Sequence, residues 1–236
     1  MDEKQYLKCE KWYIFLLLIT VGGFYGGYTY AQKGGIFCNA QTANIVLFGM
    51  ALGKQDWNQV LYLLIPISAY FLGTMVSEYT ALKIKKLHFL RWDTVLVGIE
   101  MMAVLIMGLL PSTVPDQVFQ VTINFICAMQ FNTFRQAENI PMATTFVTNH
   151  VRQTGSYLVR WLRKKDEKTY LFRSMRHFFM IAMFVIGAML ATMLCVCFHD
   201  QAILFALIVL GFVFVDLVRA DLIEEKELLN KVPGGH

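Results

Sequence analysis

The sequence predicts an all-α integral membrane protein with six transmembrane helices and two short re-entrant half-helices, arranged as two inverted three-span repeats. Of its 236 residues, 56% are hydrophobic and only 16% are charged, whereas a soluble domain typically has about 25% charged residues. Six long apolar runs account for this composition. In addition, two short segments that begin polar and end apolar resemble one another at a fixed spacing.

The composition also limits the class of protein. The mean hydropathy is +0.49, and one water-soluble core cannot enclose so much apolar surface. The five cysteines show no spacing typical of a metal site, and Cys195 and Cys197 are interpreted as small buried apolar residues. The amino-terminal apolar stretch lacks a convincing small-residue cleavage site, so we interpret it as a retained first span.

Six apolar runs are each close to the length of about 20 residues that a helix needs to cross a bilayer. A helix is expected in each, because lipid offers no hydrogen-bond partners to the backbone. The runs cover residues 12–31, 60–82, 94–110, 117–134, 178–198 and 201–218.

Two shorter segments follow the first and the fourth run. Thr148 and Gly155 in the second segment each lie 106 positions after their counterparts Thr42 and Gly49 in the first. We expect half-helices near residues 38–52 and 142–158 that dip into the membrane and return, or that lie flat on it. The expected division is therefore a first repeat over 1–113, a second over 114–222 and a cytoplasmic tail over 223–236. Because each repeat has three spans, the second is inverted relative to the first.

Lysine and arginine predict the orientation. The loop Lys83–Arg91 and the segment Arg160–Arg176 are basic, whereas the connections at 111–116 and 199–200 contain no lysine or arginine. The positive-inside rule places the basic segments in the cytoplasm. With six spans, both termini then lie in the cytoplasm too.

The half-helices and their surroundings resemble the YoaK family of uncharacterised bacterial multi-span membrane proteins. The residues that carry this resemblance are Gly35, Phe37, Gln41–Asn44, Gly49, Asn132 and Thr144–Thr148. The chain departs from the family pattern at Ala43, where the family usually has glycine, and at Gly26, where it often has aspartate. The resemblance implies a multi-pass protein of the bacterial inner membrane with a suspected transport role, and it supplies no substrate.

Polar residues gather around the two half-helix starts. A helix start has unsatisfied N–H groups and about half a positive charge, and two such ends meeting at mid-membrane favour an anion or a polar neutral solute. The alternative is that the same polar groups only cap the half-helices. The candidate substrate-binding residues are Asn39, Gln41, Thr42, Asn44, Asn132, Thr145, Thr148, Asn149 and His150.

Ionisable residues within or beside the spans are candidates for ion coupling. Glu100 lies in the middle of the third run, and charges in a bilayer are usually paired or face a water-filled path. His150 can titrate near neutral pH. The structural alternatives are that Glu100 pairs with Arg135 or His150, and that His150 is a packed histidine. Near the inner face, we expect an interfacial ion pair between Asp216 and Arg219.

The function these observations favour is a membrane transporter or channel for a small polar or anionic solute, bound near mid-membrane between the two half-helix starts. The alternative is a non-transporting assembly partner or sensor acting through the cytoplasmic basic segment 160–176. An intramembrane enzyme using Glu100 and His150 has the least support, because no enzyme signature is present. We expect no catalytic residue, cofactor or metal site.

The expected partners follow from the same features. They are the lipid bilayer, the transported solute and anionic lipid at Arg160–Arg176, where aromatic and basic residues alternate. The sequence leaves a homodimer open. Nucleic acid is not expected, since the basic segment is tied between membrane elements.

Overall fold

The computed structural model describes residues 6–84, 90–229, 231 and 233–234. The regular secondary structure of this part is helical apart from a small antiparallel hairpin, in which β1 (Gln136–Ala137) pairs with β2 (Ile140–Pro141). The predicted all-α class is confirmed. The α-helices are α1 (Trp12–Gln32), α2 (Thr42–Gly53), α3 (Trp57–Ile84), α4 (Trp92–Leu109), α5 (Asp116–Thr133), α6 (Thr148–Arg163), α7 (Lys168–Phe198) and α8 (Ala206–Arg219). Shorter helical turns are η1 (Lys8–Glu10), η2 (His199–Phe205), η3 (Ala220–Glu224) and η4 (Lys226–Leu228).

Every predicted apolar run contains a helix, and both predicted half-helix segments are helical, as α2 and α6. Several boundaries differ from the prediction; for example, α6 covers Thr148–Arg163 and not 142–158. Helix α7 begins at Lys168, before the apolar run starts at 178, because its first turns pack against α6 in a hairpin. Helix α8 begins at Ala206, because the residues before it form the 3₁₀ turn η2. Residues 85–89 of the predicted basic loop and residues 230, 232 and 235–236 of the predicted tail lie outside the described residues.

Within the described residues, four helical stretches are long and apolar enough to cross a membrane. They are Trp12–Gln32, Trp57–Ala81, Trp92–Leu109 and Lys168–Glu224, the last of which contains both α7 and α8. Helix α5 falls outside this set because glutamine and asparagine lower its hydropathy. Its polar side chains face protein, since Gln120, Asn124 and Gln130 are all fully buried.

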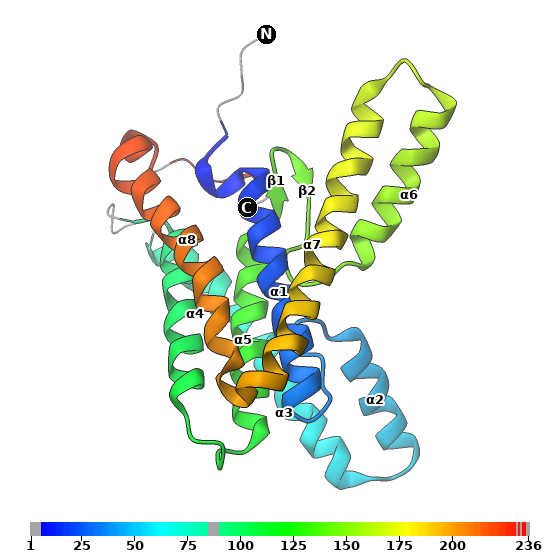
Figure 1. Cartoon of the computed structure of the whole chain (residues 1–236), viewed down its shortest axis with the longest axis vertical. Helices are drawn as coiled ribbons and strands as arrows, with labels where there is room; N and C mark the ends of the chain where they lie inside the picture. The colour runs from blue at the N-terminus through cyan, green and yellow to red at the C-terminus, as the bar shows by residue number, and fades with distance from the viewer. Residues whose placement is uncertain (1–5, 85–89, 230, 232, 235–236) are drawn as a thin grey trace.

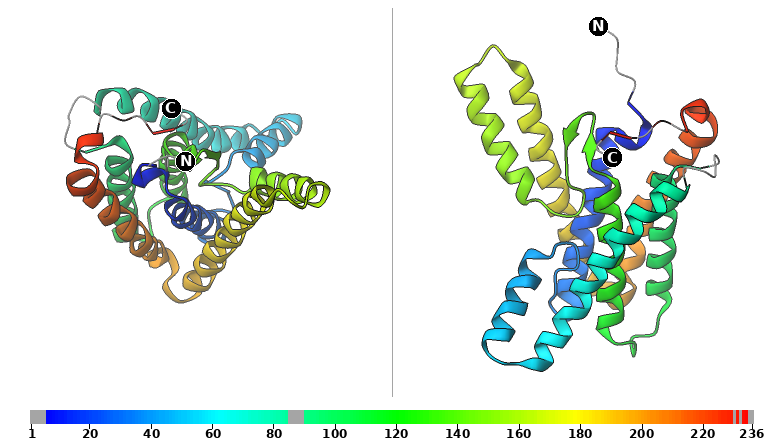
Figure 2. Two further views of the ribbon diagram at one scale, coloured as in Figure 1. Left: turned by 90° about the horizontal axis from the view of Figure 1, so that it is seen from above. Right: turned by 180° about the vertical axis from the view of Figure 1, so that it is seen from behind.

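The helices form a bundle with α1 and α5 at its centre (Figures 1 and 2). Helix α1 packs along α7, α5 packs along α3, and α4 packs against α8. Two helical hairpins, α2–α3 and α6–α7, diverge from the bundle toward its opposite ends (Figure 1).

Glycines allow α1 and α7 to approach closely. A Cβ added at Gly23 would collide with the carbonyl oxygen of Phe184, and a Cβ added at Gly187 would collide with that of Thr20. Gly73 of α3 lies against the carbonyl oxygen of Phe125 in α5 in the same way. Small residues at such positions let helix backbones meet in a membrane, where packing replaces the hydrophobic driving force.

The amino end of α1 is fixed by the turn between β1 and β2. Glu138 and Asn139 in this turn have positive φ angles of 49° and 64°. Glu138 Oε1 accepts a hydrogen bond from the Trp12 backbone N–H at 3.2 Å and so caps the helix. Arg176 of α7 forms an ion pair with the same carboxylate. Through Glu138, the turn between β1 and β2 therefore connects the start of α1 to α7.

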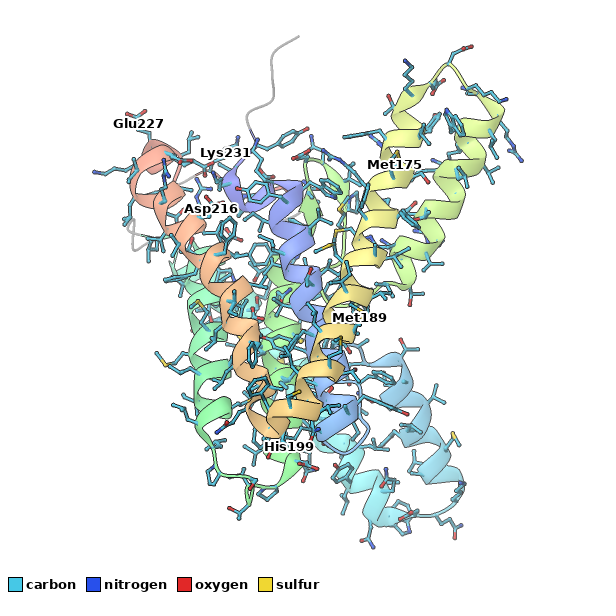
Figure 3. All side chains as sticks on the ribbon, in the orientation of Figure 1. Met175, Met189, His199, Asp216, Glu227 and Lys231 are labelled. Carbon is cyan, nitrogen blue, oxygen red and sulfur yellow. The ribbon has the colours of Figure 1, made fainter. Side chains whose placement is uncertain are left out.

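A buried lysine at the opposite end of α1 forms ion pairs with two aspartates. Lys33 is 2% exposed, and its Nζ lies 2.7 Å from Asp200 Oδ1 and 3.4 Å from Asp116 Oδ1. The same Nζ lies 3.8 Å from the centre of the Phe119 ring. These contacts link α1 to α5 and to η2, the turn that begins at His199 at the far end of the bundle from Asp216 (Figure 3).

The predicted ion pair between Asp216 and Arg219 is wrong, because Asp216 pairs with Lys8. Asp216 Oδ1 lies 3.3 Å from Lys8 Nζ, whereas Arg219 Nε lies 3.1 Å from Glu224 Oε1. The amino-terminal segment supplies the nearer cation because η1 lies beside the end of α8. Lys8 also donates its backbone N–H to Glu225 Oε1 at 2.8 Å, so the first and last described segments of the chain lie together.

We expect Gly187→Ala to lower the free energy of unfolding by about 1–3 kcal/mol, because the added methyl group overpacks the contact between α1 and α7. Thermal unfolding in detergent measures the effect. The matched control is Gly155→Ala in α6, where an added Cβ meets nothing within 4 Å. That change should stabilise the helix by about 0.5–1 kcal/mol. Equal behaviour of the two variants would contradict the close α1–α7 contact.

Candidate functional site

The amino ends of α2 and α6 both lie about midway along the length of the bundle, to one side of α1 and α5 (Figures 1 and 2). From there the two helices run apart, α2 toward one end and α6 toward the other (Figures 1 and 2). Each helix is followed by a longer partner, α3 or α7, that returns through the bundle. The structure thus places the starts of both predicted half-helices side by side.

Neither start has a side-chain cap. Gln41 and Val147 occupy the N-cap positions in helical conformation, and neither makes a capping hydrogen bond. Thr42 and Thr148 are the first helical residues. The first N–H groups of a helix have no partner within the helix. Both helices therefore present N–H groups and a partial positive charge at their amino ends.

One cavity lies between these helix starts. Its volume is about 780 Å³, within the usual range for small-molecule sites of about 300–1,000 Å³. Both segments contribute to its wall, together with single residues from α3 and α7. The lining residues are Phe37, Asn39, Ala40, Gln41, Thr42, Ala43, Ile45, Tyr70, Phe146, Val147, Thr148, Asn149, Arg152 and Phe184.

Five of the nine predicted binding residues line this cavity: Asn39, Gln41, Thr42, Thr148 and Asn149. Thr42 and Thr148 are exposed, whereas Asn39 is 3% exposed. Asn39 Nδ2 donates to the carbonyl oxygens of Gly22 at 3.1 Å and Thr145 at 3.0 Å. Asn39 therefore ties the loop before α2 both to α1 and to the segment before α6.

Gln41 and Asn44 organise the start of α2. The side-chain amide of Gln41 donates to Asn124 Oδ1 of α5. Asn44 is fully buried, and its Nδ2 donates to the Phe37 carbonyl oxygen at 2.8 Å. Asn44 thus stabilises the loop that precedes α2, and it is not one of the residues that line the cavity.

The other three predicted binding residues also lie outside the lining set. Thr145 is fully buried and contributes its carbonyl oxygen to Asn39. Asn132 belongs to a separate polar group, in which its Nδ2 donates to Ser77 Oγ at 3.3 Å and to Glu78 Oε2 at 3.1 Å. The third residue is His150.

His150 is fully buried behind the start of α6. Its Nε2 lies 2.9 Å from the Ala143 carbonyl oxygen, and its Nδ1 lies 2.9 Å from His177 Nδ1. Because a carbonyl only accepts, Nε2 of His150 is the protonated nitrogen and His177 Nδ1 donates to its Nδ1. This matches the packed histidine that the sequence left open.

Arg152 is a cavity residue that sequence reasoning missed. It lies one turn into α6, is exposed, and donates from a guanidinium nitrogen to Asn149 Oδ1 at 2.9 Å. It is the one charged residue among those that line the cavity. Its position was a usable signal, since it follows Thr148 by one helical turn and shares its helix face.

Glu100 contributes nothing to the cavity wall. It forms neither of the two pairs suggested by the sequence, since Arg135 Nη2 lies 2.8 Å from Glu78 Oε2 and His150 contacts His177. Its partner is the Tyr25 hydroxyl, which donates to Oε1 at 2.9 Å.

Comparison with known families gives one match. The model of a family described as "Protein of unknown function (DUF1275)" matches residues 14–215, which include every α-helical segment that lines the cavity. This match is compatible with the resemblance noted in the sequence. No curated protein and no solved structure matches the chain.

We expect Asn39→Ala to lower the free energy of unfolding by about 1–3 kcal/mol, because it leaves the buried carbonyl oxygens of Gly22 and Thr145 without a donor. Thermal unfolding in detergent is the measurement. Asn149→Ala is the control, because Asn149 lines the same cavity but bonds only to the exposed Arg152. A control variant that loses as much stability as Asn39→Ala would contradict the linking role of Asn39.

Proposed function

The chain belongs to the DUF1275 family, and we propose that it is a membrane transporter or channel for a small polar or anionic solute. The observation that supports this most is the cavity at which two uncapped helix starts and Arg152 come together. The solute would bind there, near the middle of the membrane, between the amino ends of α2 and α6.

The proposed topology is six spans in two inverted repeats. Helices α1, α3 and α4 with half-helix α2 form one repeat, and α5, α7 and α8 with half-helix α6 form the other. The packing supports this, because α1 lies along α7 as α5 lies along α3. Asn39 also contacts Thr145, the residue 106 positions later, as expected for equivalent positions that meet near a pseudo-twofold axis.

The proposed location is the bacterial inner membrane with both termini in the cytoplasm. The tip of the α6–α7 hairpin lies at the same end of the bundle as the first and last described segments (Figure 1). That tip has exposed basic residues, including Arg163, Lys164 and Lys165. The positive-inside rule assigns this end to the cytoplasm, where Arg160–Arg176 would contact anionic lipid.

The chemistry of the cavity selects the solute. Two helix amino ends and one guanidinium favour a carboxylate, phosphate or sulfate group over a cation. Phe37, Tyr70, Phe146 and Phe184 form an apolar wall around this charge, so a solute with a small apolar part also fits. Low polarity near the site strengthens the attraction between the fixed charge and the anion.

We expect Arg152→Gln to lower the initial rate of sulfate uptake by about tenfold or more, because a charge-assisted contact contributes about 1.5–3 kcal/mol. The assay uses purified protein in liposomes with radiolabelled sulfate, inorganic phosphate, lactate and phenylalanine. The control is Arg163→Gln, which removes an exposed arginine at the far end of the same helix, outside the cavity.

Two results would count against this function. Wild-type protein that takes up none of the four solutes would contradict transport. Equal loss of uptake in both arginine variants would contradict binding at the cavity. If solute flux is absent and a protein partner is retained through Arg160–Arg176, the alternative of an assembly partner or sensor gains the support instead.

A further inference from the structure

Glu100 of α4 is a buried carboxyl group that the proposed solute site does not use. It is 0% exposed. Its Oε1 accepts a hydrogen bond from Tyr25 of α1 at 2.9 Å, and its Oε2 has no hydrogen-bond partner among the described residues. A buried polar atom without a partner is uncommon in a folded protein and calls for an explanation.

The surroundings of Glu100 offer no positive charge. The titratable groups that face it are Tyr25 from α1 and Cys127 from α5, both fully buried. From α8, Phe214 packs against Gly98 and Gly211 lies near Met101, and residues 206–215 are apolar throughout. No cationic side chain among the described residues interacts with the carboxyl group.

An ionised carboxylate in such a place is strongly unfavourable, because nothing replaces its lost hydration. The packed arrangement therefore holds Glu100 protonated. Ionisation requires water or a cation to reach it, which requires α4 to separate from α1 and α5. The two protonation states consequently favour two different packings of these helices.

We propose that Glu100 is the proton-binding residue that couples solute movement to a proton gradient, an inference that rests on the proposed transport function. The proton binds to the carboxylate from one side of the membrane as the helices close around it. It leaves to the other side when α4 moves and water reaches Glu100. No bond other than this O–H bond forms or breaks.

Buried residues lie between Glu100 and the cavity. Cys127 of α5 lies near both Glu100 and Cys38, and all three side chains are fully buried. Cys38 directly precedes Asn39, which lines the cavity. A movement of α5 that accompanies ionisation of Glu100 would therefore reach the loop that positions the start of α2.

Infrared spectroscopy tests the protonation directly and needs no solute. A protonated buried carboxyl has a C=O stretch that an ionised one lacks. We expect this band at neutral pH in wild type and in the control Glu227→Gln, which alters an exposed glutamate, and we expect it to be missing in Glu100→Gln. Persistence of the full band in Glu100→Gln, or its absence from wild type, would overturn the proposal.

Uptake of radiolabelled sulfate and phenylalanine into liposomes tests the coupling. A difference of one pH unit supports about tenfold accumulation when one proton moves with each solute molecule and a potassium ionophore with equal potassium on both sides holds the membrane potential at zero. Wild type and Glu227→Gln should reach this level, whereas Glu100→Gln should exchange solute across the membrane without accumulating it. Retained exchange shows that the variant is folded.

The outcomes separate the two proposals. Equal gradient-driven accumulation by wild type and Glu100→Gln would overturn the coupling and leave transport standing. No uptake of either solute by wild type, with or without a gradient, would overturn transport and the coupling with it, whatever the infrared result.

Discussion

Two helices begin inside an apolar bundle, and the rest of the structure depends on how their first N–H groups are accommodated. Each unsatisfied backbone group costs several kcal/mol in a lipid environment. The chain does not satisfy these groups with side-chain caps, because Gln41 and Val147 make none. It instead places both starts at one cavity, where water or a solute can reach them. The fold therefore maintains a cavity at the two helix starts, and that cavity is the candidate site.

The surrounding helices are arranged to tolerate this polar centre. Helix α5, which contains three buried amide side chains, lies in the middle, where α1, α3 and α4 contact it. Its amides bond to neighbouring segments, for example Gln120 Nε2 to the Lys33 carbonyl oxygen at 2.9 Å. Polar contacts between membrane helices contribute about 0.6–2 kcal/mol each. They fix the register of the helices, while the close glycine contacts bring α1 against α7 and α3 against α5.

Much of this architecture could be predicted because its signals are local in sequence. Apolar run length identified the long helices, and the repeated Thr–Gly spacing identified α2 and α6. The cavity residues Asn39 and Thr148 followed from the same segments. What could not be predicted depends on residues that meet only in the folded chain. His150 contacts His177 because the α6–α7 hairpin returns at that point, and Asp216 finds Lys8 only because η1 reaches α8.

Two further features escaped prediction for different reasons. The turn at Glu138 and Asn139 lacks the glycine that usually marks positive φ angles, so the capping of α1 by Glu138 had no strong sequence signal. Arg152 was overlooked because it stands among other polar residues of an amphipathic segment. Arg152 differs from Arg160 and Arg163 in its position along α6, since only the first turns of this helix line the cavity.

The central claim is that α2 and α6 enter the membrane from opposite faces with their amino ends together. Single cysteines at the far ends of these helices, Lys54→Cys and Lys165→Cys, test it by labelling intact cells with a membrane-impermeant thiol reagent. Cys197→Ser gives a suitable background, because the other four cysteines are buried. The account predicts that Lys54→Cys is labelled from outside and Lys165→Cys only after the membrane is opened. Labelling of both from the same face would contradict it.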